Sequence, residues 1–283
     1  MDGVEQGMVG WVLQGRYRLT AHLTAGRFGD FWVAEDEQLR TPCAVKLLKP
    51  ELFQDEKALA RFERETRLLA SFRHPNLLQV VDHGQTEAGM PWLVTELTRG
   101  RNLGDAIGEL ALTVDEVRSI GAQIASVLAA AHAHGVVHRG LDPEAVLLVD
   151  DGTVRVHDFG LARRTGPTGD PVLTAIGERL GRCEYMAPEY IEETLLDART
   201  DLYVLGVILF EMLAGQPPFV GRPSTVMEKH VEEDPWVPSE ISEHDVPPWL
   251  DSLILALLAK DPGDRPASGH QVAEALQTGR WPL

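Results

Sequence analysis

The hydrophobic pattern of this 283-residue chain changes once, near residue 99, and that change restricts the fold to a few classes. Before it, short apolar runs separated by turn residues predict five strands and one helix. The predicted strands are 16–23, 31–35, 43–48, 78–82 and 92–96, and the predicted helix is 57–71. After residue 99 the stronger patterns are helical. A group of strands followed by a group of helices indicates an α+β fold.

The helical part contains four segments with clear signals. Apolar residues recur along one face as far as Ala133, which predicts a helix. Thr113 or Asp115 can cap the start of this helix. Segment 201–213 is apolar nearly all round, which is typical of a buried helix. Further helices are predicted at 249–258 and 267–276. The length fits one domain with two lobes or two small domains. The parts are an N-terminal extension 1–15, a small lobe 16–98 with a five-stranded antiparallel sheet, and a larger, mainly helical lobe 99–283.

Charge and cysteine content exclude several classes of partner. The 43 acidic and 26 basic residues give a net charge of −17, which argues against nucleic acid or an anionic membrane as the main partner. Cys43 and Cys183 have no C-x-x-C spacing, so a disulfide framework or a zinc site is not expected and a reducing cytoplasm is. No apolar run of ~18 residues occurs, so no membrane span is predicted.

Two features of the strand region carry possible chemistry. A glycine-containing turn with Gly26 and Gly29 joins two predicted strands, whereas a dinucleotide fingerprint joins a strand to a helix. Taken alone, this turn is also typical of a plain hairpin. Lys46 lies in the otherwise apolar strand 43–48, and a buried charge without a partner is costly. Lys46 therefore either lies at an exposed sheet edge or has a partner.

Further short motifs follow in a fixed order. Asp158-Phe159-Gly160 comes after a predicted strand, Ala-Pro-Glu occupies 187–189, Asp201 begins the buried helix, and Arg265 lies in a polar loop. Any one of these tripeptides occurs by chance in many proteins, but the whole set in this order and at these spacings is specific. With the glycine turn and Lys46, it makes the chain resemble the protein kinase family over about residues 16–276, and especially bacterial Ser/Thr kinases related to the eukaryotic ones.

The resemblance implies a two-lobed fold with ATP in the cleft. Gly26 and Gly29 would lie in the loop that covers the phosphates, and Lys46 would contact the α- and β-phosphates and pair with Glu65. Asp158 would bind Mg²⁺. Magnesium binding is expected to be weak, and neither ATP nor Mg²⁺ is required for the function preferred below.

For the adenine, the resemblance implies a second group of residues. Ala44 and Leu147 would hold the ring between them, and Glu96 and Thr98 would offer backbone groups behind a Thr95 gatekeeper. It also implies scaffold contacts: an ion pair of Glu189 with Arg265, stacking of His138 with Phe159, and anchoring of His138 by Asp201.

The chain departs from the family in segment 138–145, His-Arg-Gly-Leu-Asp-Pro-Glu-Ala. The family pattern is H-R-D-L-x-x-x-N, so Gly140 replaces the Asp that orients the substrate hydroxyl, and Ala145 replaces a metal-binding Asn. Losses of this kind lower rates by roughly 10² to 10⁴. Asp142 stands where Ser/Thr kinases usually have Lys, and Arg182 stands where they usually have Thr. We hypothesise that Asp142 and Arg182 form an ion pair.

Phe31 replaces a Val that lies over the adenine ring in the family. Two interpretations follow from the sequence. In the first, the Phe31 ring partly fills the adenine position and holds the domain in a kinase-like shape without ATP. In the second, the ring turns outward and the pocket is open.

The preferred function is that of a pseudokinase, a kinase-fold domain that regulates or scaffolds by binding proteins, with weak or absent ATP binding. Its partner could be an active kinase or a second copy of the chain. The alternative is an active, atypical Ser/Thr protein kinase in which Asp142 acts as the base and Asp158 holds Mg²⁺. Abolition of phosphate transfer by both Lys46→Met and Asp142→Asn would favour the alternative.

Overall fold

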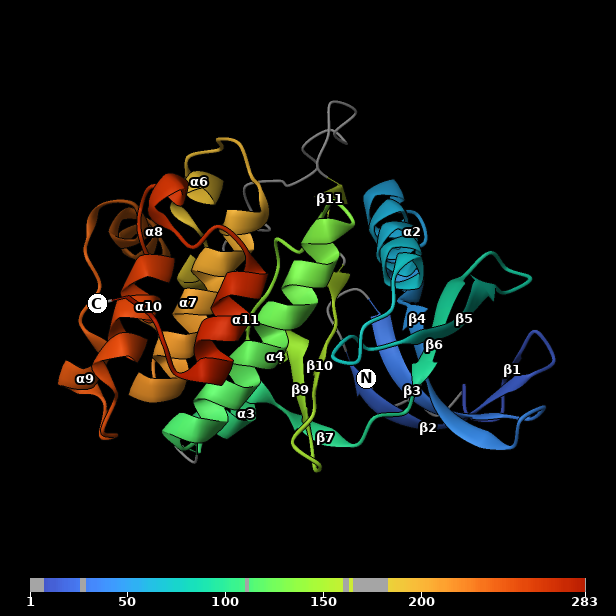
Figure 1. The fold of residues 1–283 in the computed structure, drawn as a ribbon. Coiled ribbons are helices and arrows are strands. Elements are labelled where there is room, and N and C mark those ends of the chain that lie inside the picture. Colours follow the sequence, from blue (N-terminus) through green and yellow to red (C-terminus); the bar gives the residue numbers. More distant parts are fainter. Residues whose placement is uncertain (1–7, 26–28, 110–111, 160–162, 165–182, 283) are drawn as a thin grey trace. The chain divides into compact units, whose positions relative to one another are not determined.

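The computed structural model describes residues 8–25, 29–109, 112–159, 163–164 and 183–282 (Figure 1). These residues form two compact units. The first unit contains the described residues up to Arg73 together with Leu78–Arg99, and the second contains His74–Leu77 and the described residues from Gly100 onward. The first unit is mainly a sheet and the second is mainly helical. The predicted α+β class is therefore confirmed.

The first unit is built on an antiparallel sheet with the strand order β1-β2-β3-β4-β6-β5. The strands are β1 (Val12–Leu13), β2 (Tyr17–Ala25), β3 (Gly29–Asp36), β4 (Thr41–Leu48), β5 (Val80–Gln85) and β6 (Pro91–Glu96). All five predicted strands are present. The predicted number was nevertheless one too low, because β1 adds a sixth strand from segment 1–15. A two-residue strand has no alternation of its own, so its sequence carries no strand signal.

The core of this unit is a cluster of apolar side chains from the strands of the sheet, several of them large and aromatic. Tyr17, Trp32 and Trp92 are almost completely buried in one apolar cluster. The helix α2 (Glu56–Ser71) contacts β5 and β6 and buries Phe62, with a short 3-10 helix η1 (Pro50–Leu52) preceding it. The predicted helix therefore forms and begins one residue earlier than expected.

The second unit is a group of helices around α7 (Ala198–Ala214), of which Thr200–Phe210 are all buried. Gly215, with φ of 73°, ends the helix in the left-handed region that favours glycine. The predicted buried helix is thus confirmed. The other helices are α3 (Leu103–Gly108), α4 (Val114–Ala133), α6 (Pro188–Ile191), α8 (Pro223–Glu232), α9 (Pro238–Ile241), α10 (Pro248–Leu257) and α11 (Gly269–Thr278), with 3-10 helices η2 (Pro143–Ala145), η4 (Cys183–Tyr185) and η5 (Pro262–Asp264).

The long helix α4 lies against both α7 and α11 (Figure 1). Thr113 caps it, since its hydroxyl accepts from the Glu116 amide while the Glu116 carboxylate accepts from the Thr113 amide. Of the two cap candidates, Thr113 is therefore the one used. Short strands complete the unit: β7 (Gly100–Asn102), β9 (Val146–Val149) and β10 (Val154–Val156) form one small sheet, and β8 (Val136–Val137) pairs with β11 (Arg163–Arg164).

The segment His74–Leu77 is fastened to the second unit by its polar side chains. The Asn76 amide donates to Gln123 Oε1 at 2.7 Å and to the Val154 carbonyl at 3.1 Å. His74 Nε2 lies 3.1 Å from the Ser126 hydroxyl on α4. Within the described residues, no helix combines the length and apolar character needed to cross a membrane.

Candidate functional site

Lys46 and Glu65 form a buried ion pair inside the first unit. Lys46 comes from β4 and Glu65 from α2, and Lys46 Nζ lies 2.8 and 2.7 Å from the two Glu65 carboxylate oxygens. Both side chains are less than a tenth exposed. The partner that a lysine in an apolar strand requires is therefore this glutamate, and the predicted pairing is observed.

Phe31 lies beside this pair. Phe31 on β3 and Lys46 on β4 are directly opposite each other in the sheet, so their side chains leave from the same face. Lys46 Nζ lies 5.4 Å from the centroid of the Phe31 ring, within cation–π range. The Phe31 ring thus borders the ammonium group that the resemblance assigns to phosphate binding.

The remaining predicted site residues of this unit lie on neighbouring strands. Ala44 on β4 pairs with Thr95 on β6, and both are buried. Glu96 and Thr98 are half-buried. Gly29 needs to be glycine, because a Cβ there would come within 2.5 Å of the Leu47 carbonyl oxygen. Gly26 lies outside the described residues.

In the second unit, Asp201 holds the start of segment 138–145. Its carboxylate accepts from the backbone amides of His138 at 2.8 Å and Arg139 at 2.9 Å. His132 Nε2 contacts the same carboxylate at 2.7 Å. Burial alone would raise the pKa of Asp201, but the hydrogen bond from His132 and the neighbouring charges outweigh it and the pKa is lowered. The predicted anchoring is therefore observed.

His132 is a contributor that the sequence analysis missed. It lies in the last turn of α4, and the only signal for it was a histidine shortly before the His138 motif. His138 itself is fully buried, which lowers its pKa, and its ring packs against that of Phe159, tilted by 48° with centroids 4.3 Å apart. The predicted contact between His138 and Phe159 is thus observed, with the rings tilted instead of stacked.

The three substituted positions of the segment have different surroundings. Gly140 is half-buried, and its amide donates to His138 Nδ1 at 3.3 Å. Asp142 is 2% exposed and caps η2, its Oδ1 accepting from the Ala145 amide at 3.1 Å. Ala145 is buried. The Asp142 carboxylate, two residues along the chain from Gly140, thus caps the backbone of its own loop. Arg182, its hypothesised partner, lies outside the described residues.

Asp158 follows β10 and has a φ of 63°, a left-handed conformation that aspartate tolerates better than most residues. It is half-buried, as is Leu147 on β9. Among the residues that the structure describes, no group of three or more His, Cys, Asp or Glu side chains could hold a metal ion. The family's metal-binding pattern pairs an Asn with an Asp. Here Ala145 replaces the Asn and Asp158 is retained, so the donor set fits Mg²⁺ poorly.

Glu189 and Arg265 form another buried ion pair, within the second unit. Arg265 donates to Glu189 through two nitrogens at 2.7 and 2.8 Å, and its Nε donates to the Ala259 carbonyl. Arg265 is also 4.8 Å from the centroid of the Tyr203 ring. This fork-to-carboxylate pair joins α6 to the loop before α11 and agrees with the predicted pairing.

Comparison with known proteins identifies the family of the chain. Residues 17–279 match the model of the protein kinase domain, so this chain belongs to the protein kinase family. The structure is similar to the crystal structure of the Mycobacterium tuberculosis PknI kinase domain, with a TM-score of 0.71 and 25% identity over 96% of this chain and 99% of that one.

Two curated relatives illustrate the similarity in sequence. The chain is 35% identical over 277 residues to the serine/threonine-protein kinase pkn3 of Myxococcus xanthus, covering 95% of this chain and 51% of that protein. It is 35% identical over 258 residues to the serine/threonine-protein kinase PknB of Mycolicibacterium smegmatis, covering 89% and 41%. The chain therefore spans about half the length, or less, of these relatives.

Proposed function

We propose that this domain is a pseudokinase, a protein-kinase fold that acts by binding a protein partner and transfers phosphate very slowly or not at all. The observation that carries the proposal is the state of the loop around Gly140. Gly140 has no side chain to orient a hydroxyl, and the nearby Asp142 carboxylate is buried and caps the Ala145 amide. A general base must reach the proton that it accepts, and a carboxylate committed to its own loop is poorly placed for this.

The charges of the loop support the same proposal. Phosphoryl transfer depends on positioning and on stabilising negative charge. In this loop the position usually held by Lys carries Asp142, and the Asn that would hold a second metal is the buried Ala145. Asp158 remains as a single carboxylate for Mg²⁺. The electrostatic part of catalysis is therefore weakened at several positions at once.

We also propose that ATP binds weakly. Lys46 has the charge and the supporting Glu65 that phosphate binding needs, so this part of the pattern fits a nucleotide. The Phe31 ring, however, lies 5.4 Å from Lys46 Nζ, on the sheet face where a smaller residue would leave room. This favours the first of the two interpretations of Phe31, in which its ring takes space that adenine would use. The nucleotide would then be dispensable for the fold.

The alternative, an active Ser/Thr protein kinase, is favoured by the intact Lys46–Glu65 pair and by the retained Asp158. Its curated relatives are named as kinases. In this alternative Asp142 would have to leave its cap and reach the substrate hydroxyl. We prefer the pseudokinase because the alternative needs both that rearrangement and a reversal of charge at the usual Lys position.

The experiment is a transfer assay with γ-labelled ATP, Mg²⁺ or Mn²⁺, and a mixture of Ser/Thr peptides. Wild-type protein should incorporate no label above the Lys46→Met control. The triple variant G140D/D142K/A145N restores the family pattern and should raise transfer by roughly 10² or more. Wild-type incorporation that is lost in both Lys46→Met and Asp142→Asn would instead establish the active kinase.

The partner and compartment are proposals of the same kind. A protein partner, either an active kinase or a second copy of this chain, fits a domain that keeps the kinase scaffold and loses its chemistry. Cys43 and Cys183 are both buried and unpaired with each other, which suits a reducing cytoplasm.

A further inference from the structure

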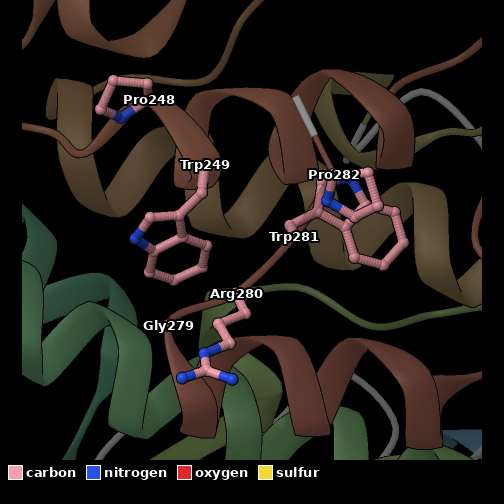
Figure 2. Close-up of a pocket in the computed structure, with 6 residues that line it drawn as sticks. All are labelled: Pro248, Trp249, Gly279, Arg280, Trp281 and Pro282. Carbon is pink, nitrogen blue, oxygen red and sulfur yellow. The ribbon is translucent and has the colours of Figure 1, made fainter.

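The second unit carries an open aromatic groove far along the chain from the loop around Gly140. It is lined by Pro248, Trp249, Gly279, Arg280, Trp281 and Pro282, and it encloses about 600 Å³. Figure 2 shows the indoles of Trp249 and Trp281 on opposite sides of the hollow, with the Arg280 guanidinium on a third side. None of these residues carries a role predicted from the sequence.

The groove is held in shape by the end of α11. Gly279 ends this helix with a φ of 69°, and the amides of Gly279 and Arg280 both donate to the Ala275 carbonyl, at 2.9 and 3.3 Å. This tight turn directs Arg280 and Trp281 back toward the start of α10, where Trp249 lies. A Cβ at Gly279 would lie 3.2 Å from a nitrogen at the end of the flexible Arg118 side chain, so the left-handed φ, more than packing, is what favours glycine here.

Arg118 fixes Trp249 from the α4 side. Its guanidinium lies 5.4 Å from the centroid of the Trp249 ring and donates to the Leu276 carbonyl and to the Asp115 carboxylate. The Trp249 ring is therefore held between Arg118 and the groove before any partner arrives. A groove with one aromatic wall already held in place binds at a lower entropic cost than one that must first assemble.

Arg280 differs from Arg118 in its own contacts. Its side chain is exposed, and among the described residues its guanidinium takes part in no ion pair or side-chain hydrogen bond. The chain as a whole has a net charge of −17, so an acidic partner is repelled over most of its surface. A cation without an ion-pair partner, placed between two indoles, marks one position where a partner carboxylate gains a contact.

We propose that this groove docks an extended, proline-rich peptide segment of a protein partner that carries an acidic residue next to its prolines. Proline rings pack flat on indole faces, and the polyproline II conformation is already extended in solution, so little entropy is lost on binding. The partner carboxylate pairs with Arg280. The inference gives the proposed function its partner contact and rests on it in that sense, but peptide binding does not depend on phosphate transfer.

The test is fluorescence polarisation with a labelled peptide of about ten residues, a length that a polyproline II segment spans as one extended strand. The peptide has alternating prolines and a pair of glutamates. Two matched peptides replace the glutamates by glutamine or the prolines by serine. The acidic proline peptide should bind the full chain saturably, the glutamine peptide should bind more weakly, and the serine peptide should not bind.

Variants locate the binding on the protein. Trp281→Ala should weaken binding about tenfold or more, as loss of a central aromatic anchor does. Arg280→Gln should weaken the acidic peptide by about threefold, the size of an exposed ion pair, and leave the glutamine peptide unchanged. Trp236→Ala is the matched control, since Trp236 is an exposed tryptophan that does not line the groove. It should bind like wild type.

Three outcomes would overturn the proposal. One is no saturable binding of the acidic peptide to folded wild-type protein. Another is equal loss in Trp281→Ala and Trp236→Ala, which would show nonspecific contact. The third is concentration-dependent self-association in sedimentation that Trp281→Ala abolishes, which would make a second copy the occupant. None of these results bears on the label-transfer assay, so the two proposals fail separately.

Discussion

Among the ion pairs described above, the buried pair of Glu189 and Arg265 should contribute strongly to the free energy of unfolding. Arg265 is completely buried, so Arg265→Met would leave the Glu189 carboxylate without its partner in a dry environment. Removing one member of such a pair costs about 3–5 kcal/mol. We expect a loss of this size in the free energy of unfolding, measured by urea titration.

The control for this prediction is the exposed pair of Lys229 and Glu233, one turn apart on and after α8, with nitrogen and oxygen 3.4 Å apart. Lys229→Ala should change the free energy of unfolding by less than about 0.5 kcal/mol, because water screens the pair. A similar loss in both variants would mean that burial is not what makes the Glu189 pair important.

Asp142 offers a second residue-scale prediction. Asp142→Ala should lower the free energy of unfolding by about 0.5–2 kcal/mol, the usual cost of losing an N-cap. Asp142→Asn should cost less, because its amide oxygen can still accept from the Ala145 amide. Equal losses in the two variants, measured by urea titration, would mean that the negative charge and not the cap is what the fold uses.

The resemblance to the kinase family predicted the ion pairs, but it did not predict the cap formed by Asp142. Lys46 in an apolar strand requires an anion, and Glu65 was the candidate in the right helix. Asp142 reversed a charge, which suggested a cationic partner such as Arg182. That pair stays a prediction, because Arg182 lies outside the described residues. The cap on the Ala145 amide is set by the turn into η2, a geometry that side-chain charges do not encode.

At the scale of elements, the approach of α7 and α10 depends on Gly206. A Cβ at this position would come within 2.7 Å of the Leu257 Cβ on α10. Gly→Ala in a helix normally gains up to about 1 kcal/mol, but overpacking costs about 1–3. Gly206→Ala should therefore lower the free energy of unfolding by about 1–2 kcal/mol.

Gly108, at the end of α3, is the matched comparison, because nothing lies within 4 Å of a Cβ there. Gly108→Ala should be neutral or stabilising by less than about 1 kcal/mol. If Gly206→Ala also stabilised the protein in thermal and urea unfolding, α10 would have to be free to move away from α7.

The contact between α7 and α8 should make stability depend on pH. His230 on α8 is buried against Tyr203, whose hydroxyl lies 2.8 Å from His230 Nδ1. Burial, aided by the charge of Lys260, lowers the pKa of His230 from 6.5 to about 4. Between these values the unfolded chain binds the proton and the folded one does not, so the free energy of unfolding falls as pH falls.

His230→Gln removes this titration, although it lowers stability at every pH by weakening the contact with Tyr203. Between pH 7 and about 4.5, wild type should lose roughly 2 kcal/mol more than the variant. The measurement is urea unfolding at several pH values in this window. Parallel losses in the two proteins would assign the acid sensitivity to other groups, such as the buried His138.

The elements themselves were predictable in proportion to their length. Strands β2 to β6, α4 and α7 were found because alternation or helical spacing persists over several residues. The two-residue β1 and the helix α8 were missed, β1 because it is stabilised by pairing with β2, and α8 because only Val226 and His230 on it are buried. Tertiary contacts, not local pattern, decide such elements.

At the scale of the whole molecule, the question is whether nucleotide stabilises the folded chain. A ligand that binds only the folded state, at about 100 times its Kd, adds roughly 2.7 kcal/mol. For a chain of this size that is a rise of several degrees in Tm. We expect almost no rise for wild type with ATP, with or without Mg²⁺, because the Phe31 ring lies over the Lys46 side of the sheet.

Phe31→Val should produce the rise, because it removes the ring and leaves the Lys46–Glu65 pair intact. Adding Lys46→Met to that variant should abolish the rise, since the ammonium group that would attract phosphate is gone. A clear rise in wild type that Lys46→Met removes would contradict the role given to Phe31 and leave the pseudokinase proposal to the transfer assay. No rise in Phe31→Val would mean that losing the ring is not enough. The Asp and Asn side chains replaced by Gly140 and Ala145, together with the reversed charge of Asp142, would then already prevent stable binding. Either result separates the loss of nucleotide binding from the loss of chemistry, which the sequence changes place in different units of the chain.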